Sequence, residues 1–264
     1  MKARGIVLLL EEYAPLTLMA SWDNSGWQVG SREEEVVGVW ITLDVTSEVV
    51  AEAEAHGANL LITHHPLIFE PLRSLDTESY KGHLIQTLLS GGMGLYVAHT
   101  NLDVVAGGVN TALAEALHLS NLQSLQPLTP TSIDKGWPGW GAVGTLSTAL
   151  TTAELASQAR HHLGTAEVRV TRGAFEPHRT LAVCGGSGAA FIAEARRAGA
   201  TAYLTGEIKY HEAQEAARAG LTVLEVGHFY SERPVLECLA GYIRIHTGLP
   251  TGVSSLITSP FDPW

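Results

Sequence analysis

Cysteine is scarce in this sequence, which has Cys184 and Cys238 among its 264 residues. Two cysteines are too few for a disulfide framework, and each lies in an apolar run, so we expect buried free thiols. The N-terminus starts with basic residues, but its apolar run covers only residues 5–10, too short for a signal peptide. No stretch approaches the roughly 18 apolar residues that a membrane span requires. We therefore expect a soluble, cytoplasmic protein with no membrane partner.

Basic residues are also in short supply. The chain has 16 Lys and Arg residues against 27 Asp and Glu residues, which gives a formal net charge of -11. The basic residues are scattered, so a nucleic-acid polyanion would be repelled, and no nucleic-acid partner is expected. The excess of carboxylates is compatible with binding cations. With 45% hydrophobic and 16% charged residues, a chain of this length can bury a sizeable core, which excludes disorder.

Apolar runs alternate with helix-like stretches in two separate parts of the chain. We expect strands at 36–43, 58–63, 94–98, 180–184, 200–205 and 221–226. We expect the intervening helices at 46–56, 83–90, 189–198 and 211–219. This alternation predicts an α/β fold with two similar halves, each with a mixed, mostly parallel sheet flanked by helices.

The two halves also align residue by residue. Residues 54–69 lie over 196–211 at a constant offset of 142, so His64-His65 falls on Gly206-Glu207. Further on the offset is 129, which pairs His99 with His228 and Asp103 with Glu232. Such similarity suggests a duplicated α/β half. We therefore expect a first half at 1–125 and a second at 126–264, closely packed with a site between them. The Pro- and Gly-rich segment 126–141 is interpreted as the linker.

Polar residues gather where the expected strands end, and open α/β sheets bind their ligands at the carboxyl ends of strands. One strand leads to His64 and His65, one to His99 and Asp103, and one to His228 and Glu232. Two adjacent histidines diverge in an extended chain, so they suit two metal ions better than one.

Two neighbouring ions need bridging carboxylates, and Asp103 and Glu232 are the candidates. Imidazole combined with carboxylate suits Zn, Fe, Mn, Co or Ni. The alternative interpretation is that His64 and His65 merely end a buried strand.

Other residues near the expected site have less distinctive signals. Glu207 and His211 are candidates for moving protons, although a structural role in the loop is equally compatible with each. Gly206 is expected to leave a gap through which substrate enters. The Gly-rich loop at 185–188 can either present N–H groups to a phosphate or form a tight turn without a ligand.

Six segments, in order, resemble the signature blocks of the NIF-three-like family. They are WDNSGWQVG (22–30), ITHHPLIF (62–69), AHTNLDVVAGGVN (98–110), GGSG (185–188), YLTGEIKYHEAQEA (203–216) and GHFYSERP (227–234). The resemblance covers nearly the whole chain and corresponds to the short bacterial form. Members of this family carry the name GTP cyclohydrolase I type 2 homologue.

The resemblance implies two divalent transition-metal ions per subunit, a homohexamer, and a specific set of ligands. These ligands are His64, His65, Asp103, His228 and Glu232. The sequence departs from the family pattern at Trp27 and Gln28, where aliphatic residues are common, and at Glu207, where Asp is common. The function implied is a metal-dependent hydrolase acting on a purine nucleotide such as GTP. The alternative is a non-catalytic protein that binds or delivers metal, or a scaffold.

Overall fold

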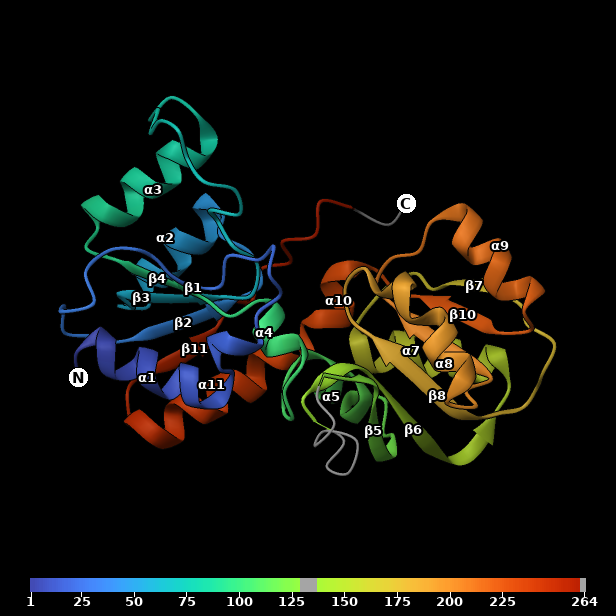
Figure 1. The fold of residues 1–264 in the computed structure, drawn as a ribbon. Helices are drawn as coiled ribbons and strands as arrows, with labels where there is room; N and C mark the ends of the chain where they lie inside the picture. The colour runs from blue at the N-terminus through green and yellow to red at the C-terminus, as the bar shows by residue number, and fades with distance from the viewer. Residues whose placement is uncertain (129–136, 262–264) are drawn as a thin grey trace. The chain divides into compact units, whose positions relative to one another are not determined.

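The chain divides into two compact units. The structure, a computed structural model, describes residues 1–128 and 137–261 (Figure 1). The first unit comprises Met1–Leu102 and Leu236–Thr258, and the second comprises Asp103–Val235 with a short C-terminal piece that begins at Ser259. The last helix and strand thus belong to the first unit, although they follow the second unit in sequence. In the described ranges, no helix is long and apolar enough to cross a membrane.

The first unit is built on a five-stranded sheet. Its order is β1 (Gly26–Val29), β4 (Gly94–Val97), β3 (Leu60–Thr63), β2 (Val39–Thr42) and β11 (Thr251–Val253). All neighbours run parallel except β1, which pairs with β4 in the antiparallel sense. Every residue of β2, β3 and β4 is buried, as expected for parallel strands that are covered on both faces.

Helices cover both faces of this sheet (Figure 1). On one side lie α2 (Ser47–Ala55) and α3 (Tyr80–Ser90), and on the other lie α1 (Ala3–Tyr13) and α11 (Pro234–Thr247). The 3-10 turn η1 (Leu16–Leu18) precedes β1, and the short helix α4 (Thr100–Asp103) follows β4. Thr46 begins α2 and Ser79 begins α3, because each side chain accepts a hydrogen bond from a first-turn N–H.

The second unit is built on a six-stranded sheet. Its order is β5 (Ser120–Pro127), β6 (Gly139–Leu150), β8 (His178–Cys184), β9 (Ala202–Thr205), β10 (Thr222–Glu225) and β7 (Arg169–Thr171). The three strands β8, β9 and β10 are parallel, while β5, β6 and β7 pair in the antiparallel sense. Both sheets confirm the predicted α/β class with mixed sheets.

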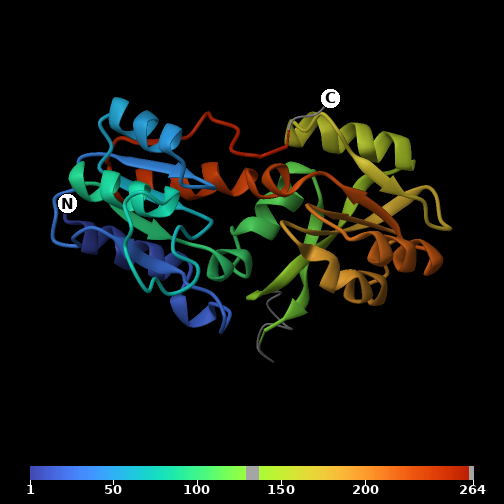
Figure 2. The same cartoon turned by 90° about the horizontal axis from the view of Figure 1, so that it is seen from above.

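Two helical layers enclose the second sheet (Figure 2). One hydrophobic cluster joins α5 (Val109–Ala116) and α7 (Thr152–Leu163) to one face. The other cluster joins α8 (Ile192–Arg197) and α9 (Tyr210–Arg218) to the opposite face. The turn η2 (Gly188–Phe191) precedes α8, and the short helix α10 (His228–Glu232) follows β10. A capping box of Thr151 and Glu154 begins α7.

The strand registers confirm the repeat. In the first sheet Thr42, Thr63 and Val97 lie side by side, and in the second Cys184, Thr205 and Glu225 do. The offset of 142 therefore holds for the first two strands of each set. The third pair differs by 128 instead of 129, because α10 contains one residue more than α4 between its start and its carboxylate. Each short helix that follows ends on a carboxylate, Asp103 or Glu232.

The segment expected as a linker is partly strand. Of residues 126–141, β5 extends to Pro127 and β6 begins at Gly139, while 129–136 lie outside the described residues. Gly139 is required by packing, because a Cβ there would lie 2.5 Å from the Ser124 Oγ atom. Composition alone suggested a loop, whereas the glycines permit two strands to approach closely.

A glutamate fastens the C-terminal segment of the first unit. The Glu52 carboxylate accepts hydrogen bonds from Trp40 Nε1 (3.0 Å), Ser254 Oγ (2.5 Å), Ser255 N (3.1 Å) and Ser255 Oγ (2.8 Å). Burial raises the pKa of Glu52, but these hydrogen bonds outweigh it and leave the pKa below its ordinary value.

We expect Glu52→Gln to lower the free energy of unfolding by about 1–3 kcal/mol at neutral pH, because a charged acceptor is lost. A lowered folded-state pKa stabilises above the unfolded-state pKa, and this stabilisation is lost as the pH falls. The difference between wild type and variant should therefore shrink below the ordinary pKa of 4.5. Urea denaturation at two pH values measures it, with Glu54→Gln on the exposed side of α2 as control. A difference that does not depend on pH would contradict the assignment.

Candidate metal centre

Three histidines of the first unit meet at the carboxyl ends of its central strands. His64 and His65 follow β3 directly, and their N–H groups continue the ladder to the carbonyls of Thr42 (3.1 Å) and Leu43 (2.8 Å). His99 follows β4. One ring nitrogen from each of the three histidines lies within 4.8 Å of the others, close enough to hold a metal ion. His64 is buried, with 2% of its surface exposed, and the other two are half-buried.

The rings are held in one tautomer. His64 Nδ1 lies 2.8 Å from the Ala98 carbonyl oxygen, His65 Nδ1 lies 2.7 Å from Asp44 Oδ1, and His99 Nδ1 lies 2.7 Å from Asp23 Oδ1. An oxygen acceptor at Nδ1 requires a proton there, so the lone pair of each neutral ring is on Nε2. Carboxylates and carbonyls in this position orient metal-ligating histidines in proteins and make them more basic.

Asp23 is a fixed anion behind His99. Its side chain is fully buried, and it accepts further hydrogen bonds from Thr100 N (3.1 Å), Thr100 Oγ1 (2.5 Å) and Ser25 Oγ (2.8 Å). Burial raises the pKa of Asp23, but the hydrogen bonds and the His99 ring hold the pKa well below its usual range. Asp44, behind His65, likewise accepts a hydrogen bond from the Thr258 hydroxyl.

In the second unit, three side chains gather around α10. His228 and Glu232 are one turn apart, and His228 Nε2 lies 3.2 Å from Glu232 Oε1. On the other side of the ring, His228 Nδ1 lies 3.1 Å from Glu207 Oε1. Two carboxylates that flank one imidazole stabilise a positive charge there, either a proton or a metal ion. Glu207 therefore lies beside a predicted ligand, as the repeat indicated, and its half-exposed carboxylate also accepts a hydrogen bond from Ser187 Oγ (2.9 Å).

The Gly-rich loop supports this cluster and is not a phosphate cradle. Its N–H groups already bond to protein side chains: Gly185 to Asn110, Gly186 to Ser231 and Gly188 to Thr205. A Cβ on Gly186 would lie 2.4 Å from Glu232 Oε1 and 3.2 Å from His228 Nε2. The loop is thus the tight turn of the two alternatives, and Gly186 leaves room for the two side chains.

The expectation for Gly206 was wrong. A Cβ there would lie 2.6 Å from the Gly186 carbonyl oxygen, 2.6 Å from Ser231 Oγ and 2.9 Å from His228 Cα. Glycine is needed at this position because the Gly-rich loop and α10 pack against it, so it does not open an entrance for substrate.

Asp103 ends α4, close to the same loop. Its carbonyl accepts a hydrogen bond from Asn110 Nδ2 (2.9 Å), and the Oδ1 atom of that amide accepts from Gly185 N (3.0 Å). Cys184 is a buried thiol, as predicted, whereas Cys238 is only partly buried. Burial raises the pKa of Cys184, and the charges of Asp103 and Glu232 raise it further.

His211 is apart from these groups. It is exposed on α9, where its ring contacts Tyr210 at 5.4 Å between centroids. In residues 1–128 and 137–261, no hydrogen bond or ion pair joins His211 to the other candidates.

Sequence reasoning left His99 out of the ligand set and did not identify Asp23 as its partner. The available signal was the pairing of His99 with His228 in the repeat. Asp23 has no such signal, because it lies 76 residues from His99 in the chain.

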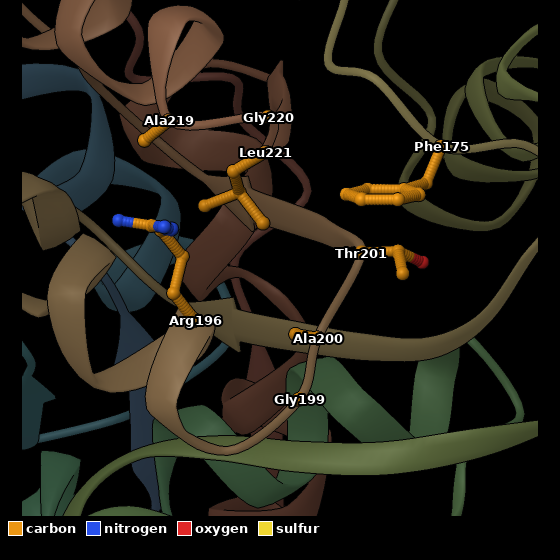
Figure 3. Close-up of a pocket in the computed structure, with 8 residues that line it drawn as sticks. All are labelled: Phe175, Arg196, Gly199, Ala200, Thr201, Ala219, Gly220 and Leu221. Atoms are coloured by element: carbon orange, nitrogen blue, oxygen red, sulfur yellow. The ribbon is translucent and has the colours of Figure 1, made fainter.

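A pocket elsewhere on the second unit does not belong to this centre (Figure 3). It is lined by Phe175, Arg196 and the residues that directly precede β9 and β10. This is the amino-terminal end of the parallel strands, whereas ligands of open α/β sheets bind at the carboxyl end.

Comparison with known proteins agrees with the fold. The sequence profile of Duf34/NIF3 (NGG1p interacting factor 3) matches residues 1–260. The chain belongs to the Duf34/NIF3 family. It is 35% identical to a GTP cyclohydrolase 1 type 2 homolog of Clostridium perfringens, over 99% of each chain. It is 36% identical to a Streptomyces coelicolor protein of the same name, over 98% of this chain and 92% of that one.

Solved Duf34/NIF3 structures have the same architecture. A hypothetical protein of Staphylococcus aureus superposes with a TM-score of 0.92 at 29% identity, covering 100% of this chain and 99% of that one. A Bacillus cereus protein related to NIF3 superposes with a TM-score of 0.89 at 27% identity, with the same coverage.

The orienting role of Asp44 is testable by metal titration. We expect Asp44→Asn to weaken metal binding about 10- to 100-fold, because His65 loses the carboxylate that fixes its tautomer. The measurement is a Zn²⁺ titration against a competing chelator. Thr258→Val is the matched control, since it removes the hydrogen bond from the Thr258 hydroxyl to Asp44 but keeps the carboxylate, and we expect a smaller effect. Wild-type affinity in Asp44→Asn would contradict the role.

Proposed function

We propose that this Duf34/NIF3 protein binds two divalent transition-metal ions through His64, His65, Asp103, His228 and Glu232, with His99 as a further donor. We further propose that it uses the ions to hydrolyse a purine nucleotide such as GTP. The names of its relatives support the reaction class, and the chemistry of the donors supports the metals.

The observation that carries the metal proposal is the hydrogen bonding of the histidine Nδ1 atoms. His64, His65 and His99 each donate Nδ1–H to a fixed oxygen, at 2.7 to 2.8 Å. A histidine that merely ends a strand has no need of such a partner, whereas a metal ligand does. Neutral imidazole together with carboxylate fits Zn, Fe, Mn, Co or Ni and does not fit Mg or Ca. The donor set therefore fits the metals that the family resemblance implies.

Bound divalent ions would supply Lewis acidity and lower the pKa of a water molecule toward neutrality. The protein's own groups have separate tasks. Asp23 and Asp44 keep the Nε2 lone pairs of their histidines available, and Asp103 and Glu232 supply the negative charge that two cations require. Glu207 is the group best placed to move a proton, because it contacts His228 and is half exposed to water.

Metal content tests the ligand assignment. We expect His65→Ala to weaken one site and leave the other partly filled, and Asp103→Ala, as a bridge, to empty both. Elemental analysis after anaerobic purification measures the stoichiometry, and His83→Ala, an exposed histidine on α3, is the control. A metal content near zero per chain in the wild type, even after metal is added back, would contradict the proposal.

Glu207→Gln tests the reaction. We expect the variant to retain its metal and to lose about 10²- to 10⁴-fold in the rate of GTP turnover, followed by the guanine absorbance. If the metal-loaded wild type leaves GTP unchanged, the protein binds or delivers metal without catalysis.

The resemblance also carries the proposal of a homohexamer, which light scattering distinguishes from the 28.2 kDa monomer.

A further inference from the structure

Two exposed aromatic side chains flank the histidines of the first unit. Trp22 is 62% exposed and Phe69 is 43% exposed, and their ring centroids lie 6.1 Å apart at an angle of 53°. Each ring also meets the His99 ring edge to face, Trp22 at 6.3 Å and Phe69 at 6.5 Å. Exposed apolar side chains that lie together beside polar groups, here the histidine rings, are typical of a binding surface.

Hydrogen bonds at neighbouring residues hold the backbone beside both rings. Trp22 directly precedes Asp23, whose buried carboxylate is fixed by His99, Thr100 and Ser25. On the other side, the residue before Phe69 is held by a side-chain amide: Ile68 N donates to Gln28 Oε1 (2.8 Å), and Gln28 Nε2 donates to Ile68 O (3.0 Å).

Asn24 adds a third hydrogen bond, from its Nδ2 atom to the Ile68 carbonyl (2.5 Å). The same strand-flanking segment thus anchors both aromatic residues. The pair is preorganised, so a ligand that uses it does not have to order it first.

From this geometry we infer that Trp22 and Phe69 form a stacking platform for a planar heteroaromatic ring, which would lie on one aromatic face and meet the other with its edge. The inference rests on the proposed function and names the part of the nucleotide that the platform recognises, the base. A phosphate suits the platform poorly, because aromatic faces are apolar and electron-rich. The His99 contacts place an edge of the stacked ring beside the imidazole donors.

Guanosine is the probe, because it carries the ring without phosphates that could bind the metals directly. We expect Trp22→Ala to weaken guanosine binding about tenfold or more, and Trp22→Phe to retain most of the affinity, as stacking on any aromatic face predicts. Phe69→Ala should weaken binding by a smaller factor. The control is Phe175→Ala, which removes a 60% exposed aromatic ring from the pocket of the second unit (Figure 3).

Calorimetric titration of the metal-loaded full chain measures these affinities, with ribose as the non-aromatic ligand. Wild-type protein that binds guanosine no better than ribose would overturn the platform. So would guanosine affinity in Trp22→Ala within about twofold of wild type. If light scattering shows that Trp22→Ala disrupts an assembly while guanosine affinity is unchanged, the pair is a contact between copies and the inference is wrong.

Metal content and GTP turnover are measured on the same samples. Loss of guanosine affinity with full metal content supports the platform whatever the turnover. Missing metal or turnover in the wild type counts against the proposed function alone.

Discussion

The hydrogen bond from histidine Nδ1 to a fixed oxygen is the interaction on which the candidate centre depends. A neutral imidazole has one lone pair, and the proton on one nitrogen decides which side of the ring offers it. Here the Ala98 carbonyl, Asp44 and Asp23 each hold the proton on Nδ1. The rest of the first unit serves to place these three acceptors. Strand β4 delivers the carbonyl, the end of β2 leads to Asp44, and the loop before β1 buries Asp23.

Matching positions of the repeat carry different residues in the two units. At the offset of 142, Asp44 corresponds to Gly186 and His65 to Glu207. In the first unit the carboxylate precedes and the histidine follows, and the two contact each other. In the second unit Glu207 instead lies beside His228, and Gly186 has no side chain, which leaves room for Glu232. A carboxylate–imidazole contact thus occurs in both units, but its two members come from different positions of the repeat.

The sequence predicted the α/β class and the central strands because parallel strands are continuous apolar runs that end at glycines and polar residues. It predicted the repeat, which the registers at Thr63 and Thr205 confirm. It did not predict α1, α11 or the strands β1, β5 and β11, because the structure that these short segments adopt depends on their tertiary contacts. The sequence also did not predict hydrogen-bond partners that are distant in the chain, such as Asp23 for His99 and Thr258 for Asp44. Gly206 was misjudged because a missing side chain indicates open space and close packing equally well.

We propose that the Nε2 atoms of His64 and His65 are presented to a divalent metal ion. Anomalous diffraction at the zinc edge, from crystals of the Zn²⁺-loaded protein, measures where the ion binds. We expect anomalous peaks at the usual zinc–nitrogen distance of about 2.0–2.1 Å from these Nε2 atoms. A peak on the Nδ1 side of either ring, or no peak within coordination distance of the two histidines, would contradict it.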